Sequence, residues 1–263
     1  MPLLKDERRD QLVQCCKQLR IGASLADRAL SCDDAGKIQF LLTLLSDEIA
    51  FRKEKRINQM IAQAHFPRIE SFEYFESSEV ELPKGLTVTD LQDLKFIQER
   101  RNLIMYGATG TGKTMLSICI GLAACRRGIP VQFFRTAALV NKLSEAREKK
   151  KLDAFLAKLN EATILIIDEF GYVPYDRAGT QILFEYLSER HEDPGKVIII
   201  TTNLEFSAWA NVVYDADMAS ALIGRLVHRC HLLLFPGGNY RLRESSINEL
   251  YQSMTVRSGK EAG

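Results

Sequence analysis

A glycine-rich loop between a strand pattern and a helix pattern constrains the fold of this chain more than any other feature. Residues 107–114 read Gly-Ala-Thr-Gly-Thr-Gly-Lys-Thr, after the apolar run 102–106 and before the helical pattern 115–124. This is the phosphate-binding pattern G-x-x-x-x-G-K-[ST] in the strand–loop–helix setting that it requires. Its bare backbone N–H groups and the following helix N-terminus form a cradle for phosphate oxygens. We therefore predict that the chain binds a nucleoside triphosphate.

The lysine and the threonine at the end of this loop have separate expected roles. We expect Lys113 to reach the β- and γ-phosphates and the Thr114 hydroxyl to coordinate Mg²⁺. ATP and Mg²⁺ are thus the predicted ligands. The predicted nucleotide-binding residues are Gly107, Ala108, Thr109, Gly110, Thr111, Gly112, Lys113 and Thr114.

From residue 102 onward, apolar runs of strand length alternate with helical patterns. The runs are 102–106, 131–134, 163–167, 196–201 and 231–235, and the helical segments lie near 113–127, 137–159, 177–191 and 218–229. Near-continuous apolar strands separated by helices predict an α/β fold with a parallel sheet covered on both faces. Phosphate then binds beyond the carboxyl ends of the strands, where the glycine-rich loop lies.

The chain before residue 96 has a different organisation. Residues 7–64 predict helices alone, because apolar side chains recur at helical spacing, and Ser31 to Asp34 offer cap residues. An irregular, acidic stretch follows, and its aromatic residues predict a connector that lies on a partner surface. The predicted division is a helical N-terminal domain for DNA or partner binding, a connector, an ATPase domain and a tail: 1–65, 66–95, 96–245 and 246–263.

Composition excludes some classes of protein and leaves others open. Lys and Arg total 35 against 34 Asp and Glu, and this balance speaks neither for nor against nucleic acid. The six cysteines show no paired spacing, as is typical of reduced thiols in the cytosol. The N-terminus is too charged for a signal peptide, and no apolar stretch approaches the roughly 18 residues of a membrane span. We predict a cytoplasmic protein with no membrane partner.

Two carboxylates follow the apolar run 163–167. Asp168 suits the Mg²⁺ site, directly or through water, and Glu169 is placed to orient and deprotonate an attacking water. An acidic pair can also simply end a strand, but this interpretation loses weight after a phosphate-binding loop. We predict Asp168 and Thr114 as metal ligands, and Lys113 and Glu169 as catalytic.

The next apolar run, 196–201, leads to Asn203. This amide could hold the attacking water against the γ-phosphate. A turn-forming asparagine after a strand is the other interpretation, and position alone favours it. We include Asn203 among the predicted catalytic residues.

The order of these segments resembles the AAA+ ATPases, and within them the initiator and helicase-loader branch. Most of the chain is similar to the IstB-like family, ATP-dependent helpers of bacterial insertion-sequence transposition. The matching phrases are Ala64–Pro67, Phe96–Ile97, Asn102–Lys113, Ile166–Tyr172, Leu187–Arg190, Thr201–Asn203, Trp209, Ala221–Leu226 and Gly238–Leu242. The resemblance implies an AAA+ P-loop NTPase with a central parallel five-stranded sheet flanked by helices, preceded by a small all-α N-terminal domain. One departure is Asp168-Glu169, where the family usually has two aspartates.

By this resemblance Arg225 is the candidate arginine finger, acting on ATP held by the neighbouring subunit. A guanidinium can neutralise the charge that spreads over the equatorial oxygens in phosphoryl transfer. Without the resemblance, an ordinary surface arginine is the plainer interpretation. Arg229, one helical turn later, is a second candidate. Little chain remains for a helical lid in which Arg241 or Arg243 would act.

Two basic clusters lie on predicted helices. In most proteins such clusters are solvated helix faces, whereas in a family that acts on DNA they become candidate contacts to the phosphate backbone. Contacts of this kind are independent of sequence and weakened by salt. The predicted DNA-binding residues are Arg52, Lys53, Lys55, Arg56, Lys149, Lys150 and Lys151.

The resemblance implies an ATPase that forms an ATP-bridged homo-oligomer on duplex DNA. Such a protein would select or remodel target DNA and recruit or stimulate the transposase of the same insertion element. The chain has no visible acidic triad for strand transfer, so it is not expected to be the transposase. The alternatives are a DnaC-like replicative helicase loader, and a scaffold that binds ATP with negligible hydrolysis, against which Glu169 argues.

Overall fold

The computed structural model describes residues 5–32, 34–172, 176–213 and 216–238 of the chain. The chain divides into two compact units, Met1–Gln59 and Met60–Gly263. The predicted boundaries near residues 65, 95 and 245 stay predictions. No helix in these described ranges is both long and apolar enough to cross a membrane.

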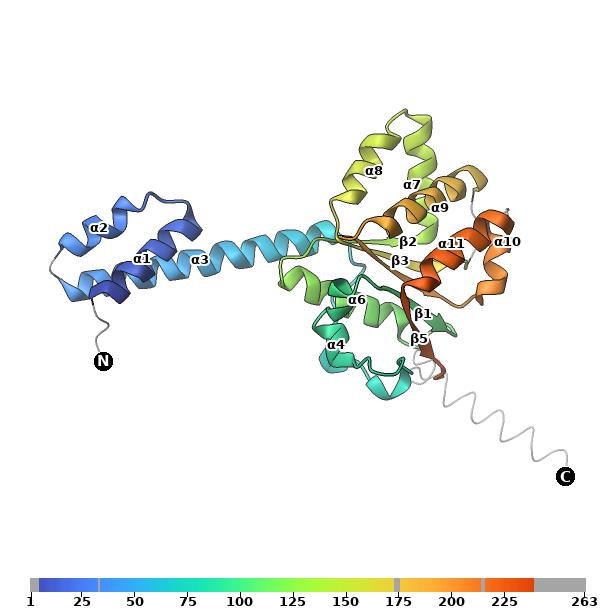
Figure 1. The fold of residues 1–263 in the computed structure, drawn as a ribbon, viewed down its shortest axis with the longest axis horizontal. Helices are drawn as coiled ribbons and strands as arrows, with labels where there is room; N and C mark the ends of the chain where they lie inside the picture. The colour runs from blue at the N-terminus through green and yellow to red at the C-terminus, as the bar shows by residue number, and fades with distance from the viewer. Residues whose placement is uncertain (1–4, 33, 173–175, 214–215, 239–263) are drawn as a thin grey trace, which may run out of the picture. The chain divides into compact units, whose positions relative to one another are not determined.

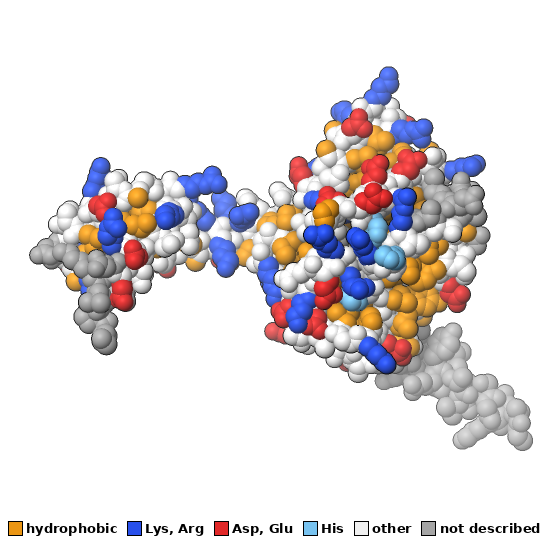
Figure 2. Space-filling model, viewed as in Figure 1, with side chains coloured by type: hydrophobic (Ala, Val, Ile, Leu, Met, Phe, Trp, Pro, Cys, Tyr) orange, Lys and Arg blue, Asp and Glu red, His pale blue; other side chains and the backbone are white. Residues whose placement is uncertain are grey.

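The first unit consists of helices, which confirms the prediction for residues 7–64. Helices α1 and α2 span Lys5–Leu19 and Ser24–Ser31, and α3 spans Ala35–Ala64, so its last residues belong to the second unit (Figure 1). The Asp34 carboxylate accepts hydrogen bonds from the backbone N–H groups of Gly36 and Lys37, which caps α3. Basic side chains occur along α3 (Figure 2). The core of this unit is formed by Leu12, Leu19, Ala26, Ile38, Leu42 and Leu45.

The second unit is built on one parallel sheet, as predicted. Its strands are β1 (Asn102–Gly107), β2 (Val131–Arg135), β3 (Ile164–Phe170), β4 (Val197–Thr202) and β5 (Cys230–Phe235). Their order in the sheet is β2-β3-β4-β1-β5, and all neighbouring pairs are parallel. The strand β4 therefore lies between β1 and β3, so the segments after these three strands meet at one edge.

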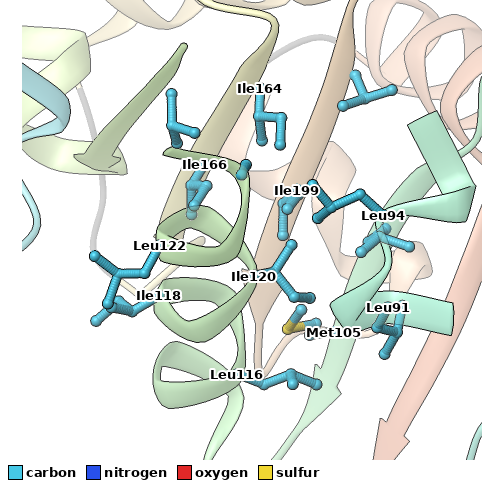
Figure 3. Packing of buried hydrophobic residues seen from close by; sticks show 14 of the residues in the cluster. Leu91, Leu94, Met105, Leu116, Ile118, Ile120, Leu122, Ile164, Ile166 and Ile199 are labelled. Atoms are coloured by element: carbon cyan, nitrogen blue, oxygen red, sulfur yellow. The ribbon is translucent and has the colours of Figure 1, made fainter. Parts of the chain in front are cut away.

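Helices cover both faces of the sheet because successive strand residues point to opposite sides. On one face, Met105, Ile166 and Ile199 pack with α6 (Lys113–Arg126), α4 (Val88–Gln92) and α5 (Lys95–Gln98) (Figure 3). On the other face, the neighbouring residues Ile104, Ile167 and Ile200 join a second core. That core is covered by helices α7 (Thr136–Glu148), α8 (Leu152–Asn160), α9 (Arg177–Glu192), α10 (Trp209–Val213) and α11 (Ala216–His228).

The helical segment predicted near 137–159 is two helices, so that prediction is wrong in its continuity. Lys150 has a left-handed φ of 54°. The N–H of Lys151 donates to the carbonyl of Ala146, and that of Lys150 to the carbonyl of Arg147. This pair of bonds is a Schellman motif, which ends α7 without a glycine. The basic residues at 149–151 therefore lie in a turn.

The segment between α3 and α4 runs close to the sheet. It contains two short 3₁₀ helices, Phe72–Tyr74 and Ser77–Glu79, and Glu81 pairs with Leu234 at the edge strand β5. Phe72 and Phe75 pack against the core of the second unit itself, whereas Tyr74 is 77% exposed. For Phe72 and Phe75, the surface that the connector was predicted to contact is therefore part of the second unit itself.

A buried arginine ties α9 to the end of α8. The guanidinium of Arg190 donates to the carbonyls of Ala162 (2.8 Å) and Thr163 (3.1 Å) and to the hydroxyl of Tyr186 (3.2 Å). Arg190→Ala removes these buried hydrogen bonds and creates a cavity, so we expect a loss of about 3 kcal/mol in the free energy of unfolding. Urea denaturation measures it, with the exposed Arg177→Ala as control. Equal stability of the two variants would contradict the assignment.

Candidate functional site

The glycine-rich loop connects the end of β1 to the start of α6. Gly112 has a φ of 95° and stands directly before α6, a conformation that a side chain would strain. At Gly107 an added Cβ would lie 2.4 Å from the carbonyl oxygen of Phe235, so β5 also requires glycine there. The loop therefore has the tight path that leaves backbone N–H groups available to an anion.

Lys113 lies folded into this loop. Its Nζ donates to the carbonyl oxygens of Gly107 (2.8 Å) and Ala108 (2.5 Å), and the side chain is almost completely buried. The Thr111 hydroxyl also donates to the Ala108 carbonyl, at 2.8 Å. The ammonium group is thus held at the centre of the loop, where phosphate oxygens would replace carbonyl oxygens as its acceptors.

Asp168 and Thr114 meet across the sheet edge. The Thr114 hydroxyl donates to Oδ1 of Asp168 at 2.8 Å, and the hydroxyl of Thr201 donates to the same oxygen at 2.5 Å. The Thr136 hydroxyl donates to the backbone carbonyl of Asp168, which is 2% exposed. A carboxylate beside a hydroxyl supplies the hard oxygen ligands that Mg²⁺ takes together with phosphates and water. The donor set therefore fits that ion.

Glu169 stands in an unusual backbone conformation. Its φ is 59°, and the pairing of β3 with β4 is irregular between Ile167 and Phe170. In place of a regular ladder bond, the Glu169 N–H donates to the hydroxyl of Thr201 at 3.1 Å. Such bulges and left-handed non-glycine residues are concentrated next to active sites, because they redirect a side chain. The Glu169 carboxylate also lies 3.6 Å from the Arg135 guanidinium.

A cavity of about 520 Å³, a size suited to a nucleotide, is lined by Lys113, Thr114 and Glu169. It extends from the loop to Glu169 and Tyr172. The segment before α4 contributes residues that the sequence did not indicate as part of the site: Arg68, Glu70, Tyr74, Phe75 and Glu76. Tyr74, a largely exposed aromatic ring at this cavity, is a surface on which a base could stack.

Asn203 and Arg225 lie elsewhere than the loop and the two carboxylates. Asn203 is exposed directly after β4, at the same sheet edge, but is not among the described residues that line the cavity. Arg225 is exposed near the end of α11, directly before β5 begins. Because β5 runs parallel to β1, the start of β5 and the end of α11 lie at the amino ends of the strands, whereas the loop follows the carboxyl end of β1. A six-residue strand separates these two ends by about 20 Å. The structure therefore separates Arg225 from the loop of its own chain.

The predicted DNA-binding residues are exposed in both clusters. Those on α3 are Arg52, Lys53, Lys55 and Arg56. The Arg52 guanidinium pairs with Glu48 at 2.6 Å. In the turn between α7 and α8, Lys149 pairs with Glu145 at 3.0 Å. Arg241 and Arg243 lie outside the described residues.

Comparison with known proteins identifies the family to which this site belongs. Residues 17–248 match the family of IstB-like ATP binding proteins. A protein named for ATP binding in insertion sequence IS5376 of Geobacillus stearothermophilus is 33% identical, over 80% of this chain and 83% of its own length. Its counterpart in insertion sequence IS21 of Pseudomonas aeruginosa is 32% identical, over 78% of this chain and 77% of its own length.

A solved structure supports the fold. The AMPPCP-bound replication initiator DnaA from Aquifex aeolicus aligns with a TM-score of 0.52 and 17% identity, over 69% of this chain and 57% of that chain. This likeness confirms the predicted fold of a parallel sheet flanked by helices. The chain is an ATPase with a phosphate-binding loop, and it belongs to the IstB-like family of insertion-sequence ATP-binding proteins.

Proposed function

We propose that this ATPase assembles with its own copies on duplex DNA when ATP is bound, selects or remodels target DNA, and recruits or stimulates the transposase of the same insertion element. The observation that carries the proposal is that Lys113, Thr114 and Glu169 line one cavity, with Asp168 hydrogen-bonded to Thr114. Family membership supports the link to transposition. In this proposal, ATP binding drives assembly on DNA and ATP hydrolysis then releases the protomers.

The candidate catalytic and metal-binding residues have distinct tasks in this proposal. When Mg²⁺ is bound, it neutralises charge on the β- and γ-phosphates. Thr114 and Asp168 would hold that ion, and Lys113 would exchange its loop carbonyls for phosphate oxygens. Glu169 would accept a proton from the attacking water. Asn203, at the same sheet edge, would help to orient that water.

ATP would lie between two protomers. Arg225 cannot easily serve the loop of its own chain, because it lies toward the other end of the strands. A guanidinium from the next protomer would instead stabilise the transferring phosphoryl group. Hydrolysis would remove the γ-phosphate and weaken this interface between protomers, so that the assembly can be released.

The first test concerns nucleotide binding. Lys113→Ala removes a charged donor from the loop, so we expect ATP affinity to fall about thirtyfold, measured with a fluorescent ATP analogue. The exposed Lys142→Ala on α7 is the matched control. Native affinity in Lys113→Ala would contradict the assignment of the cavity to ATP.

The second test concerns DNA. Changing Arg52, Lys53, Lys55 and Arg56 together to glutamine should lower affinity for duplex DNA. Each lost phosphate contact reduces the slope of log affinity against log salt by about 0.9, so the loss of four contacts should flatten the slope by about 3.6. The variant with Lys149, Lys150 and Lys151 changed to glutamine tests the other cluster in the same titration. An unchanged slope would remove that cluster from the interface.

Partner capture separates this proposal from its alternatives. A transposition helper is retained by the transposase of its element, whereas a DnaC-like loader is retained by the hexameric replicative helicase. Phosphate release stimulated by DNA would further exclude a scaffold with negligible hydrolysis. Retention by the helicase alone would favour the loader.

A further inference from the structure

A second hollow, of about 560 Å³, lies beside the end of α9 and the last two turns of α11. Its lining combines two arginines and two histidines with a single carboxylate: Arg225, Arg229, His191, His228 and Glu192. Figure 2 shows blue and pale blue side chains together on this face of the second unit. An excess of positive charge and hydrogen-bond donors suits an anionic ligand.

The tautomer of His191 is fixed by Asn102, the first residue of β1. The Ile198 N–H donates to Oδ1 of Asn102 at 2.8 Å, and a backbone N–H can only donate. The amide orientation of Asn102 is thereby set, and its Nδ2 must donate to Nδ1 of His191, 3.0 Å away. In the neutral imidazole, the proton is therefore on Nε2, on the other side of the ring.

The same asparagine also anchors the neighbouring arginine. Asn102 is 4% exposed, and its backbone N–H donates to the carbonyl of Arg229 at 2.8 Å. One strand residue thus positions both the His191 ring and the backbone at Arg229, one helical turn after Arg225. Such preorganisation is what a site needs when it must meet charge that develops in a reaction.

The surroundings keep the imidazole neutral. Burial and the charge of Arg229 hold the pKa of His191 below its usual value of 6.5, with further lowering from His228 and Arg225. Glu192 acts in the opposite direction. At neutral pH, His191 is therefore a hydrogen-bond donor through Nε2 that adds no charge of its own.

We propose that His191 binds the phosphate oxygens of ATP held by the neighbouring protomer, beside Arg225. This inference rests on the proposed function: the loop of the same chain lies at the other end of the strands, so the ATP that reaches this hollow in the assembly is the one held by a second copy. Arg225 would supply the charge, and the Nε2–H of His191 would fix the direction from which the phosphate enters. His191 is then a substrate-binding residue that acts only in trans.

A mixture of two defective protomers tests this directly. The reporter protomer, Arg225→Ala, binds ATP but offers no finger. The donor protomer, Lys113→Ala, offers a finger but binds ATP weakly and lacks the loop lysine that hydrolysis needs. ATP is therefore hydrolysed only at interfaces where the ATP of a reporter protomer meets the finger of a donor protomer. His191→Leu in the donor should lower the steady-state rate of this mixture about tenfold, as for loss of a hydrogen bond to a charged group. The same change in the reporter should leave the rate within about twofold.

The remaining arms separate binding from folding. His191→Gln in the donor should retain activity, because Oε1 can accept from Asn102 while Nε2 still donates. A purely structural role would make His191→Leu equally harmful in both protomers, and that result would overturn the inference. Reduced DNA affinity with unchanged hydrolysis would overturn it too, since the anion would then be DNA. No activity in the parent mixture would instead overturn the proposed function, and this inference with it.

Discussion

Arg225→Ala is expected to bind ATP with native affinity but to hydrolyse it about 1,000-fold more slowly, because arginine fingers contribute a factor of this size or more. Affinity should be preserved, since Arg225 is not among the described residues that line the nucleotide cavity of its own chain. The measurement combines steady-state phosphate release with equilibrium binding of an ATP analogue. The exposed Arg177→Ala on α9 serves as the control.

A mixture of two defective variants reveals whether Arg225 acts across the interface between protomers. Each joint of a head-to-tail assembly has one ATP side and one finger side. In an equal mixture of Arg225→Ala and Lys113→Ala, about one joint in four combines both intact parts. Hydrolysis should therefore recover to a substantial fraction of the native rate. Failure to recover, with both variants folded and associated, would place the action of Arg225 elsewhere.

Glu169→Gln should bind ATP normally and hydrolyse it on the order of 100- to 1,000-fold more slowly, the usual contribution of a general base. Glutamine keeps the size and the backbone N–H that donates to Thr201. The loss of the 3.6 Å pair with Arg135 should cost little, because both side chains are substantially exposed. Single-turnover hydrolysis measures the chemical step apart from product release.

A trapped assembly is the second consequence of this substitution. If hydrolysis releases the joint between protomers, Glu169→Gln with ATP should remain assembled on DNA far longer than the native protein. The exposed Glu161→Gln is the matched control. A native hydrolysis rate in Glu169→Gln would show that another group accepts the proton.

The sequence was sufficient for the sheet and for the phosphate-binding loop. Both depend on local patterns, namely apolar runs of strand length and glycines at fixed spacing. The break between α7 and α8 was missed because Lys150 takes the left-handed position that glycine usually occupies.

The finer structure of the site depends on contacts between distant strands. Thr201 holds both Asp168 and the backbone of Glu169, and this contact requires the register of β3 against β4. The bond between Asn102 and His191 joins residues 89 positions apart. The separation of Arg225 from its own loop follows from the parallel pairing of β1 with β5. No periodicity in the sequence contains this information.

The central claim is that one triphosphate is held by the loop of one protomer and capped by the arginine of the next. Analytical ultracentrifugation of the native chain with duplex DNA and a non-hydrolysable ATP analogue tests it most directly. We predict particles of several protomers that form only when the analogue is present. Lys113→Ala should need an analogue concentration about thirtyfold higher to form them. Particles that stay monomeric at saturating analogue and DNA would contradict it.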